Sequence, residues 1–281
     1  MPNQPKPLTA FEQTRLSWAR RIESPAELPP AFRGLFDPDR PLPYAVLTPT
    51  YEGFLRRLSA KLAWCTDDTL TVAEQTRDRL TTTVFPFAAL DFLELGCVLL
   101  KSWLSVAGAA AVTLEFNTVT DYLFTPIVDA IRGIPMLAER PASRGHGAVR
   151  GTKPQELVAL RERDMKLAYY ARCSLPPGDD LQAILYQGAA RYGALARPVP
   201  AHATLLTGRE LILIRDAPGG QRYGSVRIFI PLDRVAGAAL EERRPGAFTL
   251  KLCLRGGGIL EATFAAANVP AVRDLVAQLP R

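Results

Sequence analysis

The sequence predicts a mostly β protein (α+β) with two antiparallel β domains, each a barrel or sandwich closed by a C-terminal helix. The first observation is an internal repeat: residues 66–70 and 207–211 share a Thr-x-x-x-Leu turn that leads into an apolar run. Further along, the Pro-centred hexamers at 85–90 and 230–235 match position by position in apolar character. The second observation is that short runs of β-branched and aromatic residues alternate with turn residues, as antiparallel strands require. Such self-similarity indicates a duplicated unit.

The chain length suits two domains of ordinary size, because 281 residues with 48% hydrophobic composition can bury two cores. We place an N-terminal helix and a Pro-rich strap at 1–43 and the first β domain at 44–133. A linker follows at 134–154, where Gly and Pro occur without periodicity. A connecting helix and the second β domain occupy 155–281.

The first half begins with a predicted helix and a strap. Thr9 followed by Glu12 resembles a capping box, which opens a helix that extends to about Glu23. Residues 24–43 are rich in proline and therefore predict an extended strap that lies on the first domain. The expected strands are 44–47, 62–65, 69–73, 80–87, 90–99, 102–107 and 112–117, and the closing helix is 123–132.

The second half repeats this order after one connecting helix. Residues 155–173 are rich in Leu, Ala, Arg and Lys, and a Pro-Pro-Gly sequence ends the predicted helix. The Gly-Gly-Gly sequence at 256–258 stands between two strands and predicts a hairpin, since it lacks the Lys-Ser/Thr of a phosphate-binding loop. The expected strands are 181–187, 203–206, 211–215, 225–231, 235–241, 247–254 and 259–264, and the closing helix is 272–279.

Charge is unevenly distributed along the chain, whose net charge is +6. Residues 1–140 carry 14 basic and 16 acidic side chains, whereas the remainder carries 20 and 12. A basic second half suits an anionic membrane, phosphate or an acidic protein partner. The other interpretation is that arginine serves only for solubility here, because basic residues alternate with apolar ones.

The four cysteines indicate a reducing compartment. Cys65, Cys97, Cys173 and Cys253 are far apart and show neither metal-ligand spacing nor a disulfide framework. The first residues do not resemble a signal peptide. The most hydrophobic region, residues 84–114, contains Asp, Glu and Lys and predicts strands instead of a membrane span. We therefore expect a cytoplasmic protein, with peripheral association at the inner face of the membrane as a further option.

The order of strands, the Pro-centred strand end and the closing amphipathic helix resemble the pleckstrin-homology-like (PH-like) fold, especially its bacterial members. The resemblance is clearest over residues 203–279 and more diffuse over 62–132. It implies a bent pair of antiparallel sheets plugged by the helix, and a role in binding phosphoinositides, peptides or proteins. Members that grip phosphoinositides have a Lys and then an Arg-x-Arg pair near the first hairpin. Neither repeat has that pattern, so no phosphate-binding residue is carried over.

The best candidates for a partner-binding or lipid-binding surface are four arginines of the second half. Arg243 and Arg244 precede a proline in a predicted hairpin loop, and Arg222 and Arg227 extend them into a basic rim. The alternative is a set of solvated loop residues. Nucleic acid is an unlikely partner, because few aromatic residues alternate with the basic ones.

The sequence offers little for catalysis, metal binding or cofactor binding. Nucleophilic catalysis needs a positioned base, but His146 lies in the Gly-rich linker and His202 at the start of a strand between alanines. The adjacent acidic pairs at 67–68 and 179–180 stand beside turns, where Asp bonds the local backbone. We expect no catalytic residue, no metal site and no cofactor.

The sequence therefore predicts a non-enzymatic binding or scaffold protein with duplicated PH-like domains, which recognises a protein partner or assembles with itself. An unpaired sheet edge would permit such assembly. The first alternative is a peripheral protein that binds anionic lipid through the basic loops of the second domain. The second alternative is an enzyme on a β-barrel scaffold, which a deep pocket with convergent polar groups would support.

Overall fold

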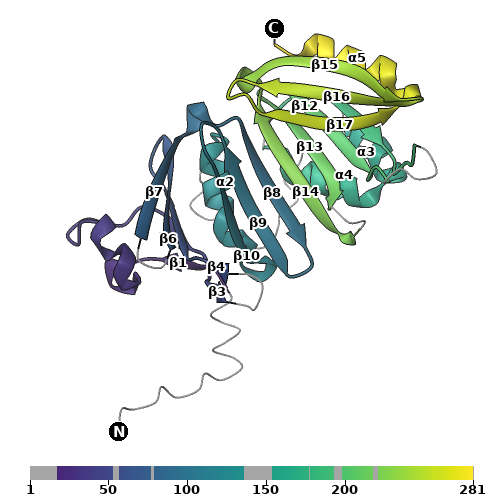
Figure 1. Cartoon of the computed structure of the whole chain (residues 1–281). Coiled ribbons are helices and arrows are strands. Elements are labelled where there is room, and N and C mark those ends of the chain that lie inside the picture. The colour runs from purple at the N-terminus through teal and green to yellow at the C-terminus, as the bar shows by residue number, and fades with distance from the viewer. Residues whose placement is uncertain are drawn as a thin grey trace. The chain divides into compact units, whose positions relative to one another are not determined.

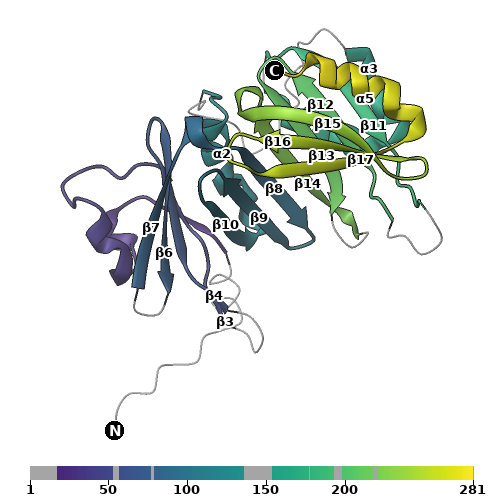
Figure 2. The same ribbon diagram turned by 45° about the horizontal axis from the view of Figure 1, so that its top comes forward.

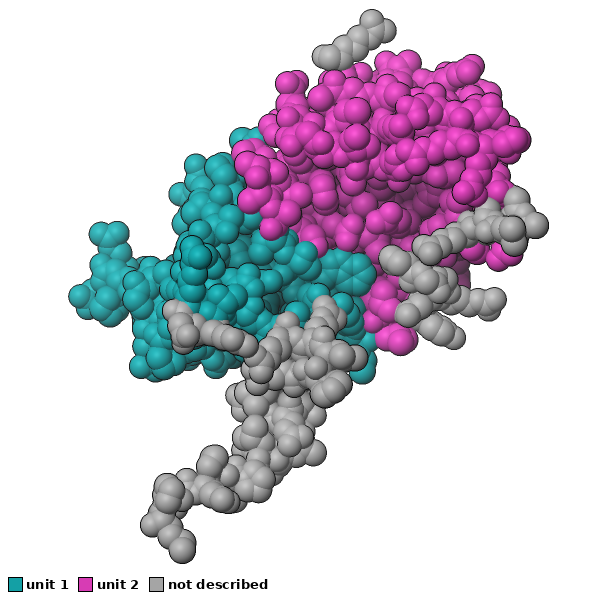
Figure 3. All heavy atoms as spheres, viewed as in Figure 1, with its two compact units in different colours: residues 1–88, 100–103, 112–136 teal, residues 89–99, 104–111, 137–281 magenta. Residues whose placement is uncertain are grey.

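The computed structural model describes residues 18–52, 57–76, 79–135, 154–176, 178–192, 198–217 and 221–280. These residues form a mostly β fold of antiparallel sheets (Figure 1). The chain divides into two compact units (Figure 3). Unit 1 comprises Met1–Ala88, Leu100–Trp103 and Val112–Met136, and unit 2 comprises Ala89–Leu99, Leu104–Ala111 and Leu137–Arg281.

The main sheet of unit 1 has five strands in the order β1-β2-β5-β6-β7, and β7 forms one end of it. The strands are β1 (Arg20–Ile22), β2 (Ala45–Leu47), β5 (Lys61–Cys65), β6 (Thr69–Thr76) and β7 (Arg79–Pro86). A two-stranded ladder, β3 (Tyr51–Glu52) with β4 (Arg57–Leu58), lies between β2 and β5 in the chain. The unit ends with a 3-10 segment, η4 (Thr118–Phe124), and helix α2 (Thr125–Ile131).

The Pro-rich segment packs against the five-stranded sheet. Two 3-10 turns, η1 (Pro25–Glu27) and η2 (Pro30–Leu35), each begin at a proline, whose fixed φ and missing N–H suit the first helical position. Phe32 of η2 is fully buried in a cluster with Leu62 of β5. Phe36 meets Trp64 edge to face, with ring centroids 5.0 Å apart. The segment thus supplies core side chains to unit 1.

The seven-stranded sheet combines four strands of the second half with three strands of the first half. Its order is β10-β9-β8-β14-β13-β12-β11. The strands are β8 (Phe92–Val98), β9 (Lys101–Ala107), β10 (Ala111–Asn117), β11 (Leu181–Gln187), β12 (His202–Thr207), β13 (Glu210–Ala217) and β14 (Gln221–Pro231). Residues of β9 and β10 are divided between the two units. A three-stranded sheet has β16 (Ala247–Leu254) between β15 (Val235–Arg244) and β17 (Ile259–Ala265).

Strand β12 is buried along its whole length, because both faces of its sheet are covered. Helices α3 (Pro154–Arg163) and α4 (Met165–Ser174) pack on one face, and the β15-β16-β17 sheet lies over the other (Figure 2). Helix α5 (Val269–Gln278) contacts both β11 and β15, and it buries Val269, Val272 and Leu275. It therefore closes one end of the layered unit.

The order of elements in the first half recurs in the second. When the β3–β4 ladder is left out of the count, four strands, of which the fourth ends in proline, are followed by a three-residue 3-10 turn, three strands and a terminal helix. The 3-10 turns are η3 (Phe87–Ala89) and η5 (Leu232–Arg234). We call residues 45–131 the first repeat and residues 181–278 the second repeat. In this comparison β7 corresponds to β14, and β8 corresponds to β15.

Three expectations from the sequence need correction. Arg20–Ile22, predicted as the end of a helix, form strand β1 paired with β2, while residues 9–17 of that predicted helix lie outside the described residues. The single helix predicted at 155–173 is interrupted at Asp164, whose extended backbone and side chain cap α4 by accepting the Leu167 N–H at 2.9 Å. No sheet of the described residues closes into a barrel, since each ends in two edge strands.

In the same residues, no helix has both the length and the hydropathy of a membrane span.

Replacing Phe32 with Ala should destabilise unit 1 by about 4 kcal/mol, because the substitution leaves a cavity beneath the strap. Urea unfolding followed by tryptophan fluorescence measures this change. Tyr122→Ala is the control, since Tyr122 is 61% exposed and its loss should change the free energy of unfolding by less than about 1 kcal/mol. Equal unfolding midpoints for the two variants would contradict a structural role for the strap.

Candidate interaction site

The structure distributes the four predicted arginines over two sheets. Arg227 lies on β14, with its guanidinium carbon 5.7 Å from the ring centroid of Tyr170 on α4. Arg243 lies on β15 and donates through Nη2 to Glu261 Oε1 at 2.6 Å. Arg244 is exposed at the end of β15. Arg222 belongs to β14, but its side chain lies outside the described residues. The basic rim stays a prediction, and two of its members already contact neighbours within the protein.

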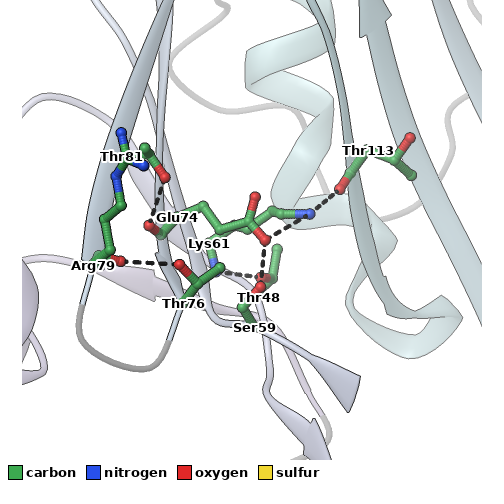
Figure 4. A network of polar contacts seen from close by, with 8 residues as sticks. All are labelled: Thr48, Ser59, Lys61, Glu74, Thr76, Arg79, Thr81 and Thr113. Atoms are coloured by element: carbon green, nitrogen blue, oxygen red, sulfur yellow. Dashed lines mark hydrogen bonds and ion pairs between the residues drawn. The ribbon is translucent and has the colours of Figure 1, made fainter. Parts of the chain in front are cut away.

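A polar network in unit 1 surrounds the side chain of Lys61 (Figure 4). Its Nζ donates to the Thr113 carbonyl at 2.9 Å and lies 3.6 Å from Glu74 Oε1. The Ser59 hydroxyl donates to the same carboxylate, and the Lys61 N–H donates to Thr48 Oγ1 at 2.9 Å. The ammonium and the carboxylate offset each other's charge, so this cluster ties β5, β6 and β10 together.

The hollow beside this network is small. Its volume is about 80 Å³, whereas small-molecule sites usually occupy about 300–1,000 Å³. The lining residues are Thr48, Pro49, Leu58, Ser59, Lys61, Thr113 and Glu115. This hollow therefore does not supply the deep pocket that the enzyme alternative calls for.

His202 is a buried side chain of β12. Its Nδ1 lies 3.3 Å from the Pro200 carbonyl oxygen. Its ring packs edge to face against Phe264 of β17, with the ring centroids 4.8 Å apart. Burial lowers its pKa to about 4, with a smaller contribution from the nearby Arg215 charge, although the bond to Pro200 acts in the opposite direction. His202 is thus a neutral core residue at neutral pH. The described residues contain no cluster of His, Cys, Asp and Glu that could hold a metal, and His146 lies outside them.

The pairing of β8 with β14 joins the first repeat to the second. Six residue pairs connect the strands, from Leu93 opposite Phe229 to Val98 opposite Gly224. Position 224 requires glycine because the backbone of β8 approaches it closely: a Cβ there would lie 2.7 Å from the Cys97 carbonyl oxygen. Arg215 on β13 adds an ion pair to Glu94 on β8, with Nη2 and Oε2 3.6 Å apart. Strand β8 therefore occupies the edge of β14 in a defined register.

The carboxylate of Asp91 secures this pairing at the start of β8. Asp91 is 3% exposed, and its Oδ1 accepts from Arg234 Nη2 at 2.9 Å and from the Gly256 N–H at 3.0 Å. Arg234 ends η5, and Gly256 lies in the β16–β17 hairpin, where Gly257 adopts φ +86°. A Cβ on Gly256 would lie 1.9 Å from Asp91 Oδ2. The predicted hairpin is therefore present, and its first glycine makes room for a carboxylate from the other repeat.

Sequence reasoning did not assign a role to Asp91. Its charge, within residues 84–114, indicated only that this region does not span a membrane. The available signal was its position, because an Asp that immediately precedes an apolar strand must be solvated or paired. Its partners lie more than a hundred positions away in the chain, and no local pattern links them.

Each sheet of the described residues ends in strands that have one open side, and β7 and β15 are two of these edge strands (Figures 1 and 2). Phe87 donates its backbone N–H to the Asp68 carbonyl at 2.8 Å, and the β6–β7 register continues without interruption. Because antiparallel ladders alternate, the amides of odd-numbered residues of β7 bond to β6 and those of even-numbered residues point outward. The outward amides are those of Leu80, Thr82 and Val84.

Removing the Asp91 carboxylate should destabilise unit 2 strongly. Asp91→Ala leaves the largely buried Arg234 guanidinium without this partner, and breaking a buried ion pair costs about 3–5 kcal/mol. Denaturant unfolding of the full chain measures the loss. Asp233→Ala is the matched control, because this exposed neighbouring carboxylate should contribute less than about 0.5 kcal/mol. Similar losses in both variants would show that Asp91 does not secure the strand pairing.

Acidification should destabilise the protein through His202. The unfolded side chain gains a proton near its ordinary pKa of 6.5, whereas the folded side chain gains it only near pH 4. Between these values the unfolded state binds more protons, so stability falls as pH falls, by at most about 3 kcal/mol. His202→Phe should remove this part of the slope in unfolding experiments at pH 4–7. An unchanged slope would contradict the buried neutral state.

Similarity to known proteins adds no assignment: no protein-family model matches this chain, and no curated protein matches it.

Proposed function

We propose that this chain is a non-enzymatic binding or scaffold protein built from two PH-like repeats, and that the edge of β7 receives an extended strand from a protein partner. The repeated order of four strands, three strands and a terminal helix supports the PH-like assignment. Addition of a strand to an open edge is an established mode of peptide recognition, in which main-chain hydrogen bonds supply affinity.

The observation that carries this proposal is the composition and exposure of β7. The strand has eight residues, Thr81–Thr83 form an uninterrupted β-branched run, and Val84 is 55% exposed. Natural edge strands are usually short, charged or interrupted by bulges or prolines. Arg79 is the single charged residue of β7, and Pro86 stands at its last position. The edge therefore lacks the usual protection against an added strand.

The anionic-lipid alternative has less support in the structure. Binding to a membrane surface depends on basic side chains that face it together. Arg243 is paired with Glu261, and Arg227 contacts Tyr170 on α4. Arg244 is the member of the predicted rim that is exposed at a strand end. Binding of a partner's extended strand at the edge of β7 is consequently the function that the geometry supports best.

Selection of displayed peptides on the immobilised full-length protein tests this function. Selected peptides should alternate apolar and polar residues, because one face of an added strand meets the protein. Thr82→Pro should weaken their binding at least tenfold, since it removes an outward amide without breaking the β6–β7 ladder. Thr82→Ser keeps the amide and should bind as the original protein does. Peptides that bind Thr82→Pro and the original protein equally would refute strand addition at β7.

A further inference from the structure

We infer that the strand received by β7 is β15 of a second copy of this chain, so that copies associate head to tail. This inference rests on the proposed function of β7 and names the partner at that edge. It follows from the pairing of β8 with β14, because β15 and β7 are the counterparts of these two strands in the other repeat.

The chain contains one example of the contact. The fifth strand of the first repeat, β8, pairs with the fourth strand of the second repeat, β14. The two remaining counterparts are the fourth strand of the first repeat, β7, and the fifth strand of the second repeat, β15. Each stands at the end of its sheet in the described residues. Pairing β15 of one copy with β7 of another would repeat between chains the contact that exists within a chain.

The repeats also define a register for this contact. Alignment of Pro86 with Pro231 shifts residue numbers by 145, and it places Val84 on Phe229 and Ala238 on Leu93. Since Leu93 lies opposite Phe229 in the chain, Ala238 should lie opposite Val84, and Ala239 opposite Thr83. By the same alignment, the six pairs of β8 with β14 place residues 238–243 of β15 opposite residues 79–84 of β7. Residues 237–242 of β15 lie between its two register shifts, so most of the proposed contact falls on regular strand.

The contact between chains should be weaker than the contact within the chain, because it lacks the Asp91 ion pair. The same alignment places Ala236 at the position of Asp91 and Ala89 at the position of Arg234. A strand ladder without a buried ion pair would hold the copies together through main-chain bonds and small side chains. The association is therefore reversible and depends on concentration.

A head-to-tail contact uses two different surfaces, so each added copy again presents one free β7 and one free β15. Contacts of this type produce a ring where the rotation closes and a filament where it does not. The observable consequence is a molar mass that rises with protein concentration.

The first experiment installs the missing ion pair between chains. Ala89→Arg combined with Ala236→Asp should strengthen self-association at least tenfold, as measured by sedimentation equilibrium of the full chain over a range of concentrations. Each single substitution should change association less than threefold, because either charge alone lacks its partner. Adding Thr82→Pro to the double variant should return the mass to that of the monomer. A double variant that is folded by circular dichroism and stays monomeric would overturn the inference.

A second experiment uses the register and does not depend on the fold of the charged variant. Thr83→Cys and Ala239→Cys are made separately, each with Cys173 and Cys253 replaced by Ser, and the two proteins are mixed under mild oxidation. A covalent heterodimer is expected from this pair. Thr83→Cys mixed with Ile259→Cys is the control, because Ile259 is exposed on β17, outside the proposed contact. Equal yields in both mixtures would overturn the inference.

The experiments distinguish the occupant of β7 from the strand-accepting role of its edge. If copies do not associate and displayed peptides still bind at β7, the strand-accepting role of that edge stands and β15 is not its occupant. If peptides bind equally to the original protein and to Thr82→Pro, the role of the edge itself is refuted.

Discussion

The arrangement of unit 2 depends on one buried carboxylate. A buried charge is tolerated only where its hydrogen-bonding capacity is used, and Asp91 meets this requirement through Arg234 and the Gly256 N–H. The carboxylate also fixes the register of β8 on β14. A slip by one residue would withdraw it from Arg234 and would turn the apolar side chains of β8 to the opposite face of the sheet. The sheet that includes strands of both repeats thus has a single favourable alignment.

The two repeats share an order of elements but differ at their edges. β14 is covered by β8, whereas β7 carries outward amides and an exposed Val84. Glycine marks the covered edge, since Gly224 allows the Cys97 carbonyl to approach closely, and its counterpart on β7 is Arg79. β15 differs again, with two bulges and four charged residues at its end. Duplication therefore supplied similar strands, and substitutions at a few positions determine which edges are covered.

Much of the local structure could be predicted from the sequence, because strand length and alternation are local properties. Residues 181–187 and 247–254 were predicted as strands and coincide with β11 and β16. Arg20–Ile22 were mistaken for helix, since three residues do not distinguish the two periodicities and only pairing with β2 makes them a strand. Asp164 was overlooked as a cap because the residues around it favour helix on both sides. The pairing of β8 with β14 leaves no local pattern, and composition does not reveal that Arg243 faces Glu261.

The position of β8 in the chain affects how the protein is made. Strand β8 leaves the ribosome before β14 exists, and synthesis from Val98 to Gly224 at about 5–20 residues per second takes on the order of ten seconds. During that interval β8 has β9 on one side and an open edge on the other, and the Asp91 carboxylate lacks Arg234. Contacts between positions this distant also slow folding, because closing the long intervening loop costs entropy before the contact stabilises the chain. The open edge of β8 is therefore covered only after β14 of the second repeat has been synthesised, and shielding of this edge by a chaperone would favour correct folding.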